Sequence, residues 1–328
     1  MTRPHAFVTG GTGFLGRHLI EELLDQGWQV TAFHRPSANI SALTQLDLRL
    51  VSAELHQPET LTQSIAPGTD AVFHVAGDTS MWRQANRRQY LANVVGTRNL
   101  LEAALNAGVG RFIHTSSVAV YGVEFQDLSE ECPQQGREAP IGYFRTKTEA
   151  EEEVRKYINK GLDAVLLNPC NIVGPYDAHN WGRLIRMLHD GSLPGTPPGA
   201  GNFCHVRDVA RGHIAAFEKG RTGENYLLGG FNASFLDMIN TAATQLGRPP
   251  IRKTTPASLL KTAAWVSQGI SLLTRREPDL TPEVCALMCA HQSLKTDKAF
   301  NELGYQSANI ETMVADCIAW MRSEGMLS

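Results

Sequence analysis

A glycine-rich turn close to the start of the chain limits what this sequence can fold into more than any other feature. The sequence TGGTGFLG begins at Thr9 and spaces Gly10, Gly13 and Gly16 three residues apart. The residues before it suit a strand, and residues 15–25 carry leucines at helical spacing. Glycine permits a tight turn and a close approach to the backbone, and the following helix begins with free N–H groups. The pattern predicts a strand, a turn and a helix that can bind an anion.

Short runs of β-branched and aromatic residues recur along the first half of the chain, and helical stretches separate them. The runs are residues 5–8, 28–34, 48–52, 70–75, 111–115 and 163–167. Strands that alternate with helices in this way form βαβ units and a parallel sheet with helices on both faces. We therefore expect an α/β fold with a doubly wound parallel sheet.

Inside a complete βαβ unit, the glycine turn favours binding of a dinucleotide pyrophosphate over a purely structural bend. A site specific for NAD normally has Asp or Glu at the end of the second strand, against the ribose 2′-hydroxyl. Here the sequence from Ala32 reads AFHRPS and holds no carboxylate. Arg35 suits a 2′-phosphate and Ser37 adds a hydroxyl donor, although Arg35 also fits the role of a solvated loop arginine. We expect NADP(H) as the cofactor, with NAD(H) as the alternative.

After residue 167, the regular alternation of strand-like and helix-like segments ends. We expect a loop after residue 175, then a glycine- and proline-rich stretch over 191–201 where substrate-facing elements begin. A helix over 208–218 and a strand over 225–228 indicate a return to the sheet, so a second lobe is interleaved with the first. The expected division is a dinucleotide-binding domain over 1–170, joined by 203–230, and a smaller C-terminal lobe over 171–328 that mainly binds substrate.

Tyr143 and Lys147 form a second feature with chemical meaning. They stand four residues apart at the start of an expected helix, so their side chains share one face. A free phenol has a pKa of about 10, and a neighbouring ammonium together with an oxidised nicotinamide would lower that pKa towards neutrality. The spacing alone is common on helix surfaces. Here the spacing indicates a catalytic pair more strongly, because two other motifs precede it in the chain. They are the glycine turn and the serines of TSSVAVYG, which begins at Thr115.

Taken in this order, the motifs resemble those of the extended short-chain dehydrogenase/reductase superfamily over nearly the whole chain. Besides the glycine turn, the serines, Tyr143 and Lys147, the resemblance rests on HVAG from His74, NVVGTRNLLE from Asn93 and NPCNIVGP from Asn168. It implies a Rossmann fold and an NAD(P)-dependent oxidoreductase. Members of this family often form homodimers through helices beside the central sheet, so the resemblance leaves a homodimer open and does not fix the oligomeric state.

The resemblance also implies catalytic roles for individual residues. Ser117 would hydrogen-bond the substrate carbonyl, Tyr143 would donate or accept the proton, and Lys147 would bind the nicotinamide ribose and tune Tyr143. Ser116 is the second candidate for the serine, because the choice depends on where the strand ends. Asn93 matches an asparagine that anchors structure or a water chain more often than it touches substrate.

The glycine turn and the resemblance together give the expected cofactor-binding residues. In this superfamily the third strand is usually followed by a small residue, Asp and Leu; here Ala53, Glu54 and Leu55 stand there, so Glu54 would make the adenine contact with a longer side chain. The full set is Gly10, Gly13, Phe14, Leu15, Gly16, Arg35, Ser37, Glu54, Leu55, Val75, Ala76, Gly77, Tyr143, Lys147, Pro169 and Ile172.

Within the superfamily, the sequence is most similar to the dihydroflavonol-4-reductase-like and hopanoid-associated epimerase-like branch. The similarity rests on RPSAN from Arg35, HVRDVARGH from His205 and GENYLLGG from Gly223. It implies an NADP(H)-dependent carbonyl reductase or alcohol dehydrogenase that acts on a small, fairly apolar ketone or aldehyde. Two alternatives stay open: a nucleotide-sugar epimerase or dehydratase with bound NAD, and a dinucleotide-sensing regulator without turnover. An intact serine, tyrosine and lysine set argues against the regulator.

Residues 257–273 form an apolar stretch whose only charge is Lys261. The stretch is too short and too polar for a membrane span. We expect a helix packed on the core of its own lobe, which would place an apolar wall near the site. A lid over the substrate and a membrane-surface patch are the alternatives.

Composition excludes several classes of partner. The formal net charge of -3 gives no broad positive field, so we expect a small-molecule substrate and neither nucleic acid nor an anionic membrane. The six cysteines lack the spacing of a disulfide framework or zinc site, and nothing completes a ligand set around Cys285 and Cys289, so no metal is expected. The N-terminus runs directly into a strand without an apolar signal segment, and we expect a cytoplasmic protein without a transmembrane segment.

Overall fold

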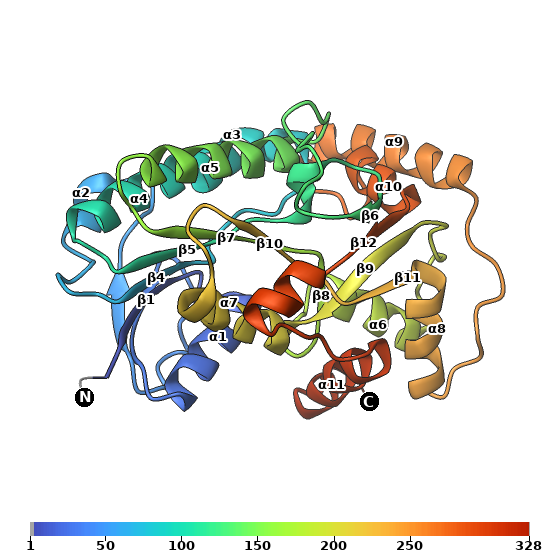
Figure 1. Ribbon diagram of the computed structural model, residues 1–328. Helices are drawn as coiled ribbons and strands as arrows, with labels where there is room; N and C mark the ends of the chain where they lie inside the picture. The colour runs from blue at the N-terminus through green and yellow to red at the C-terminus, as the bar shows by residue number, and fades with distance from the viewer. Residues whose placement is uncertain (1–2, 328) are drawn as a thin grey trace.

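A seven-stranded parallel sheet forms the centre of the protein in the computed structural model, which describes residues 3–327 (Figure 1). The strand order is β10-β7-β5-β4-β1-β2-β3. The strands are β1 (His5–Thr9), β2 (Gln29–His34), β3 (Arg49–Ser52), β4 (Ala71–His74), β5 (Arg111–Thr115), β7 (Ala164–Pro169) and β10 (Asn225–Leu228). The expected doubly wound α/β sheet is confirmed, including the late strand at 225–228 that returns to it.

The strand order reverses between β1 and β4. The first three strands follow one another towards one edge of the sheet, and β4, β5, β7 and β10 follow towards the other. All neighbouring pairs are parallel, so their carboxyl ends meet along a single edge. In sheets of this kind, ligands bind outside the carboxyl ends at the point of reversal. The turn after β1 and the segment after β4 lie at that point.

Helices cover both faces of the sheet, with α1 and α7 on one face and α2 to α5 on the other (Figure 1). The strands feed both layers: Ala6 and Val8 of β1 enter one buried cluster, and Phe7 enters the other. The helices are α1 (Phe14–Asp25), α2 (Pro58–Thr62), η1 (Arg83–Ala85), α3 (Asn86–Tyr90), η2 (Leu91–Val95), α4 (Gly96–Asn106), η3 (Val118–Tyr121), α5 (Gly142–Ile158), α7 (Val206–Lys219) and η4 (Ala299–Leu303).

A second group of elements adjoins the carboxyl edge of this sheet. It contains a three-stranded sheet in the order β11-β9-β8 and three helices that share one hydrophobic core. Its elements are β8 (Asn171–Val173), α6 (Trp181–Asp190), β9 (Ala200–His205), β11 (Phe231–Ser234), α8 (Phe235–Gln245) and α11 (Ile310–Ser323). The loop expected after residue 175 contains α6, so that expectation is wrong. Ile185 and Leu188 of α6 enter the shared core, which stabilises this helix.

Two helices and a small sheet complete the described chain. They are β6 (Phe125–Leu128), α9 (Ala257–Thr274), α10 (Pro282–Cys289) and β12 (Gln292–Leu294), with β12 paired to β6. The expectation that residues 257–273 pack on the core is wrong: only Ala264 and Ser271 of α9 are buried, and its large apolar side chains face solvent. Within residues 3–327, no helix combines the length and hydropathy needed to span a bilayer.

Candidate active site

The glycine turn connects β1 to α1 and lies so close to the segment after β4 that side chains do not fit at two of its positions. Gly10 has φ of +77°, and a Cβ atom there would lie 2.6 Å from the backbone nitrogen of Ala76. A Cβ atom on Gly16 would overlap the carbonyl oxygen of Gly10. Gly13 precedes α1 as its N-cap, without a side chain to cover the free N–H groups of the first turn. The turn therefore fits a pyrophosphate, as its sequence predicts.

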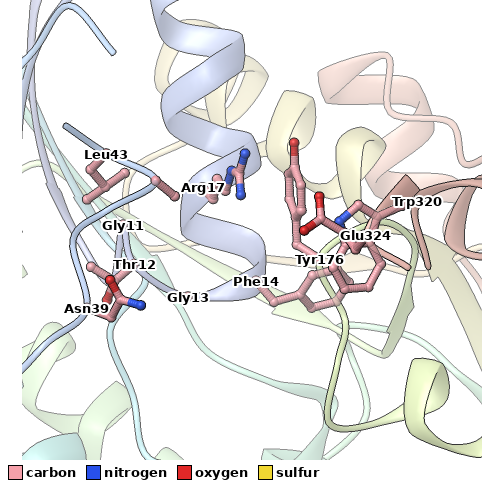
Figure 2. Close-up of a pocket in the computed structure, with 11 residues that line it drawn as sticks. Gly11, Thr12, Gly13, Phe14, Arg17, Asn39, Leu43, Tyr176, Trp320 and Glu324 are labelled. Atoms are coloured by element: carbon pink, nitrogen blue, oxygen red, sulfur yellow. The ribbon is translucent and has the colours of Figure 1, made fainter. Parts of the chain in front are cut away.

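A cavity of about 210 Å³ lies over this turn (Figure 2). Gly11, Thr12 and Gly13 line one side, and Tyr176 and Trp320 line another. Its remaining lining residues are Phe14, Arg17, Asn39, Ala42, Leu43 and Glu324. Exposed backbone at a helix N-terminus beside aromatic side chains suits the phosphate and ring portions of a dinucleotide.

Arg17 and Tyr176 are parts of this cavity that sequence reasoning missed. The Arg17 guanidinium carbon lies 3.6 Å from the centre of the Tyr176 ring, and its Nε lies 3.0 Å from a carboxylate oxygen of Glu21. The position of Arg17, one residue after the last glycine of the turn, is a signal that could have identified it. No sequence pattern connects Tyr176 to the turn, because they meet only through the fold.

The residues expected around the adenosine end lie in two neighbouring loops. Arg35 and Ser37 are exposed in the turn after β2, and Glu54 and Leu55 are half-buried after β3. The carbonyl oxygen of Leu55 accepts a hydrogen bond of 3.0 Å from the Asn99 side chain, which holds the second loop against α4. All four residues stand at the carboxyl edge of the sheet.

The other expected cofactor residues follow β4 and β7 along the same edge. Val75, Ala76 and Gly77 follow β4, and the Ala76 N–H donates to the Thr9 hydroxyl over 3.2 Å. Pro169 ends β7 and Ile172 lies in β8. In the first turn of α1, Phe14 lines the cavity, whereas the side chain of Leu15 is buried in the core. Leu15 can therefore face a cofactor only through its backbone.

Tyr143 and Lys147 occupy the first two turns of α5, as their spacing predicts. Gly142 begins this helix where a Cβ atom would overlap the Asn86 side chain, so α5 starts in close contact with α3. The Lys147 ammonium donates a hydrogen bond of 2.6 Å to the carbonyl oxygen of Thr115, the last residue of β5. Tyr143 is half-buried and hydrogen-bonds with the Ser117 side chain.

The structure separates the two candidate serines. The N–H of Ser116 donates a hydrogen bond of 2.7 Å to the carbonyl oxygen of Leu167 and so continues the pairing of β5 with β7. The Ser116 side chain is buried. Ser117 caps η3 by accepting a hydrogen bond from the Ala119 N–H, and it stays partly accessible beside Tyr143. Of the two serines, Ser117 is therefore the more accessible one and the one that interacts with Tyr143.

Burial shifts the pKa values of the tyrosine and the lysine in opposite directions. Burial raises the pKa of Tyr143, and its hydrogen bond with Ser117 offsets part of that rise, so the lowering expected beside Lys147 is not found in this structure. Burial lowers the pKa of Lys147 to about 8, although the nearby Glu151 carboxylate opposes this shift. The phenol is therefore protonated near neutrality, and the ammonium still carries most of its charge.

Glu151 is a residue near the site that sequence reasoning missed. It lies one helical turn beyond Lys147 and is fully buried. Its carboxylate accepts hydrogen bonds from the side-chain amides of Asn168 over 2.7 Å, Gln134 over 2.7 Å and Asn225 over 3.0 Å. The four-residue spacing of Glu151 from Lys147 was a signal, but its partners come from β7, β10 and a loop.

Asn93 anchors the segment after β4 to α5. Its side-chain nitrogen donates to the Asp78 carbonyl oxygen over 2.9 Å and to the Thr146 hydroxyl over 3.1 Å. Its side-chain oxygen accepts from the Asp78 N–H over 2.7 Å. These contacts match the anchoring role that the resemblance implies.

Tyr143 packs against a cluster of apolar side chains. They belong to the loop after β4, to η3 and its following loop, to the start of α5 and to α10: Met81, Ala119, Val123, Ala139, Ile141, Phe144 and Leu287. A substrate carbonyl that reaches Tyr143 and Ser117 would therefore lie against an apolar wall. No cluster of three or more His, Cys, Asp or Glu side chains that could hold a metal exists within residues 3–327.

Comparisons with known proteins agree with this geometry. Residues 6–229 match the model of the NAD dependent epimerase/dehydratase family. A Synechocystis protein named for dihydroflavonol 4-reductase is 34% identical, over 97% of this chain and 95% of its own. Sterol demethylase protein B of Methylococcus capsulatus is 31% identical, over 98% of this chain and 99% of its own. The crystal structure of gox2253 is 34% identical, has a TM-score of 0.86, and is matched over 99% of this chain and 100% of its own. The chain therefore belongs to the NAD dependent epimerase/dehydratase family and is an NAD(P)-dependent oxidoreductase of the extended short-chain dehydrogenase/reductase type.

Proposed function

We propose that this protein is an NADP(H)-dependent carbonyl reductase, or alcohol dehydrogenase in the reverse direction, for a fairly apolar substrate. The observation that carries the proposal is the set of Ser117, Tyr143 and Lys147 at the carboxyl edge of the sheet, beside an apolar wall. We further propose that the C-terminal lobe, residues 171–328, mainly binds the substrate.

The protonation states of the site suit reduction of a carbonyl. When bound, the reduced nicotinamide supplies a hydride to the carbonyl carbon. The phenol of Tyr143 donates its proton to the carbonyl oxygen, and the Ser117 hydroxyl hydrogen-bonds to the same oxygen. Lys147 stabilises the phenolate that the transfer leaves behind, because its cation lies one helical turn away and is fixed by Thr115. The same groups act in the opposite sense for alcohol oxidation.

The cofactor preference is proposed from the loop after β2. This loop carries an exposed arginine and no carboxylate between residues 32 and 37. A carboxylate there would repel a 2′-phosphate, whereas Arg35 can pair with it and Ser37 can donate to it. We therefore assign NADP(H) ahead of NAD(H).

The substrate class is proposed from the apolar surroundings of Tyr143. A nucleotide-sugar substrate needs cationic and polar partners for its diphosphate. Two residues after Tyr143, the Arg145 side chain instead donates to the Ala139 carbonyl oxygen over 2.9 Å, and the cluster that Tyr143 packs against is apolar. The relatives named for dihydroflavonol and sterol chemistry also favour a substrate with a large apolar part.

A substrate panel tests the proposal. Purified protein is mixed with NADPH or NADH and with ketones and aldehydes of increasing apolar size, and loss of reduced-cofactor absorbance is followed. We expect turnover with NADPH and a rise in kcat/KM with apolar size. Conversion of UDP-sugars or dTDP-sugars without ketone reduction would replace the proposal with an epimerase or dehydratase. Dinucleotide binding without turnover of any compound would favour a regulator.

A further inference from the structure

Helix α9 exposes most of its large apolar side chains. Leu259, Val266, Ile270 and Leu273 recur at steps of seven, four and three residues and share one face. These side chains are 60%, 58%, 54% and 87% exposed. The opposite face, with Ala264 and Ser271, is the buried one. A surface helix normally buries its apolar face against the protein core. In α9 the apolar face is exposed instead, so we expect a partner outside this chain to cover it.

The exposed apolar side chains are concentrated on this one helix. Trp265 and Leu272 extend the face, at 61% and 60% exposed. The large apolar side chains exposed within residues 3–327 are Tyr90, Leu91, Phe231, Leu259, Trp265, Val266, Ile270, Leu272, Leu273 and Phe300, so six of the ten belong to α9. Six exposed apolar side chains on one helix indicate an interaction site, whereas single exposed apolar residues do not.

The expectation that an anionic membrane is not a partner rested on the net charge of the whole chain, whereas basic residues gather near α9. No Asp or Glu occurs from residue 238 to residue 276, whereas five basic residues in this stretch border or lie on α9 and are exposed: Arg252, Lys253, Lys261, Arg275 and Arg276. The next two carboxylates, Glu277 and Asp279, line a surface pocket together with Ile270 of α9, and each has a partner. Glu277 accepts from the Ser80 hydroxyl over 2.5 Å, and Asp279 pairs with Arg183 over 2.5 Å. An apolar face with a tryptophan and flanking cations complements an anionic lipid surface.

The helix next to α9 connects this patch to the reaction site. α9 packs against α10, and Leu287 of α10 contacts the apolar wall beside Tyr143. The Thr281 hydroxyl at the start of α10 donates to the Met81 carbonyl oxygen over 3.3 Å, so α10 is also tied to the loop after β4. A compound leaving a bilayer at α9 would therefore be one helix away from the proposed substrate site.

We propose that α9 docks this protein on an anionic membrane surface. Leu259, Val266, Ile270 and Leu273 enter the interfacial layer, and Arg275 and Arg276 contact the headgroups. The helix lies in the plane of the membrane and does not cross it. The docking itself is independent of the proposed reduction; only its use for loading a lipophilic substrate depends on that function.

Vesicle co-sedimentation tests the proposal with the full chain. We expect the protein to bind vesicles of phosphatidylcholine and phosphatidylglycerol at least about tenfold more tightly than vesicles of phosphatidylcholine alone. The double variant Ile270→Glu/Leu273→Glu should lose this binding. The matched control, Phe231→Glu/Phe300→Glu, changes exposed apolar residues outside α9 and should bind as the unmodified protein does.

The charge requirement has its own pair of variants. Arg275→Gln/Arg276→Gln should weaken binding to the anionic vesicles by about tenfold or more, because each basic residue near the surface contributes. Arg186→Gln/Arg322→Gln, which removes exposed arginines from α6 and α11, should not. Tryptophan emission should shift to shorter wavelength on anionic vesicles, and Trp265→Phe should abolish most of that shift.

Three results would overturn the proposal. One is equal binding of the unmodified protein and the Ile270→Glu/Leu273→Glu variant to anionic vesicles. Another is no vesicle binding at all. The third is a dimer in sedimentation velocity that the same variant dissociates, because a second copy would then cover the face. Reduction of a short water-soluble ketone by the α9 variants is measured in parallel. It should be unchanged, which separates a failure of docking from a failure of the proposed activity.

Discussion

The ammonium of Lys147 donates a hydrogen bond of 2.6 Å to the carbonyl oxygen of Thr115 and so joins α5 to the end of β5. This bond fixes a buried cation one helical turn from Tyr143, and Ser117 follows two residues after Thr115. The three proposed catalytic side chains are thereby positioned by one strand end and one helix start. The predictions below depend on this arrangement.

Carbonyl reduction should lose rate as the pH rises through about 8. Burial lowers the pKa of Lys147 to about 8, so its cation is present below that pH and lost above it. Without the cation, the phenolate of Tyr143 loses its electrostatic partner in the transition state. The measurement is kcat/KM for a confirmed ketone from about pH 6 to pH 10.

Glu151→Gln sharpens this test. The Glu151 carboxylate raises the pKa of Lys147, so its removal should move the alkaline limb to lower pH. Glu149→Gln, on the same helix, is the matched control and should leave the profile in place. A profile that is flat through pH 8, or that does not move in Glu151→Gln, would contradict the role given to the Lys147 cation.

Lys147→Met should both weaken cofactor binding and slow turnover. The substitution keeps an apolar side chain of similar length in the buried position but removes the proposed ribose contact and the charge beside Tyr143. Titration of the variant with NADPH, followed by single-turnover kinetics, measures the two effects separately. Lys156→Met removes an exposed lysine from the same helix and should change neither. Unchanged NADPH affinity in Lys147→Met would exclude the ribose contact.

The parts of the fold that sequence patterns predicted are those with strong local signals. The strands of the central sheet are short apolar runs between helices, and buried strands such as β7 show this pattern directly. The three-residue spacing of the glycines likewise identified the turn after β1, where Gly10 and Gly16 are required by contacts that the structure contains.

The failures have two causes. For α6 a local signal existed and was not used: Trp181, Leu184, Ile185 and Leu188 recur at helical spacing. The helix is stabilised by a core shared with α8 and α11. For α9, the apolar composition predicted burial, but composition does not determine which face of a helix finds a partner. Glu151 was missed because its amide partners are contributed by separate segments.

NADPH should bind at least tenfold more tightly than NADH, equivalent to about 1.4 kcal/mol. The reason is the exposed Arg35 in a loop without a carboxylate. Arg35→Ala should remove most of the difference by weakening NADPH and sparing NADH, as measured by fluorescence titration. The control is Arg49→Ala. Arg49 begins β3 and so lies at the amino end of the strand, away from the expected cofactor residues at the carboxyl ends. Equal affinities in the unmodified protein would contradict the NADP assignment and leave the fold unaffected.

Ser117→Ala should slow turnover by about 10- to 100-fold with little effect on NADPH binding, because it removes one hydrogen bond to the reacting oxygen. Ser116→Ala should have a much smaller effect on kcat, since the Ser116 side chain is buried and its N–H pairs with β7. Steady-state kinetics on both variants distinguish the two serines. A large loss in Ser116→Ala with a normal Ser117→Ala would show that the reacting oxygen is bound by Ser116.

The most direct test of the account is turnover by Tyr143→Phe on a confirmed ketone. The substitution removes the proposed proton donor and keeps the ring that packs against Phe144. NADPH should bind with nearly unchanged affinity, while kcat falls by about 10²-fold or more at every pH. Circular dichroism and the NADPH titration establish that the variant is folded and loaded. Near-normal kcat in a folded, NADPH-bound Tyr143→Phe variant would contradict the assignment of Tyr143 as the acid.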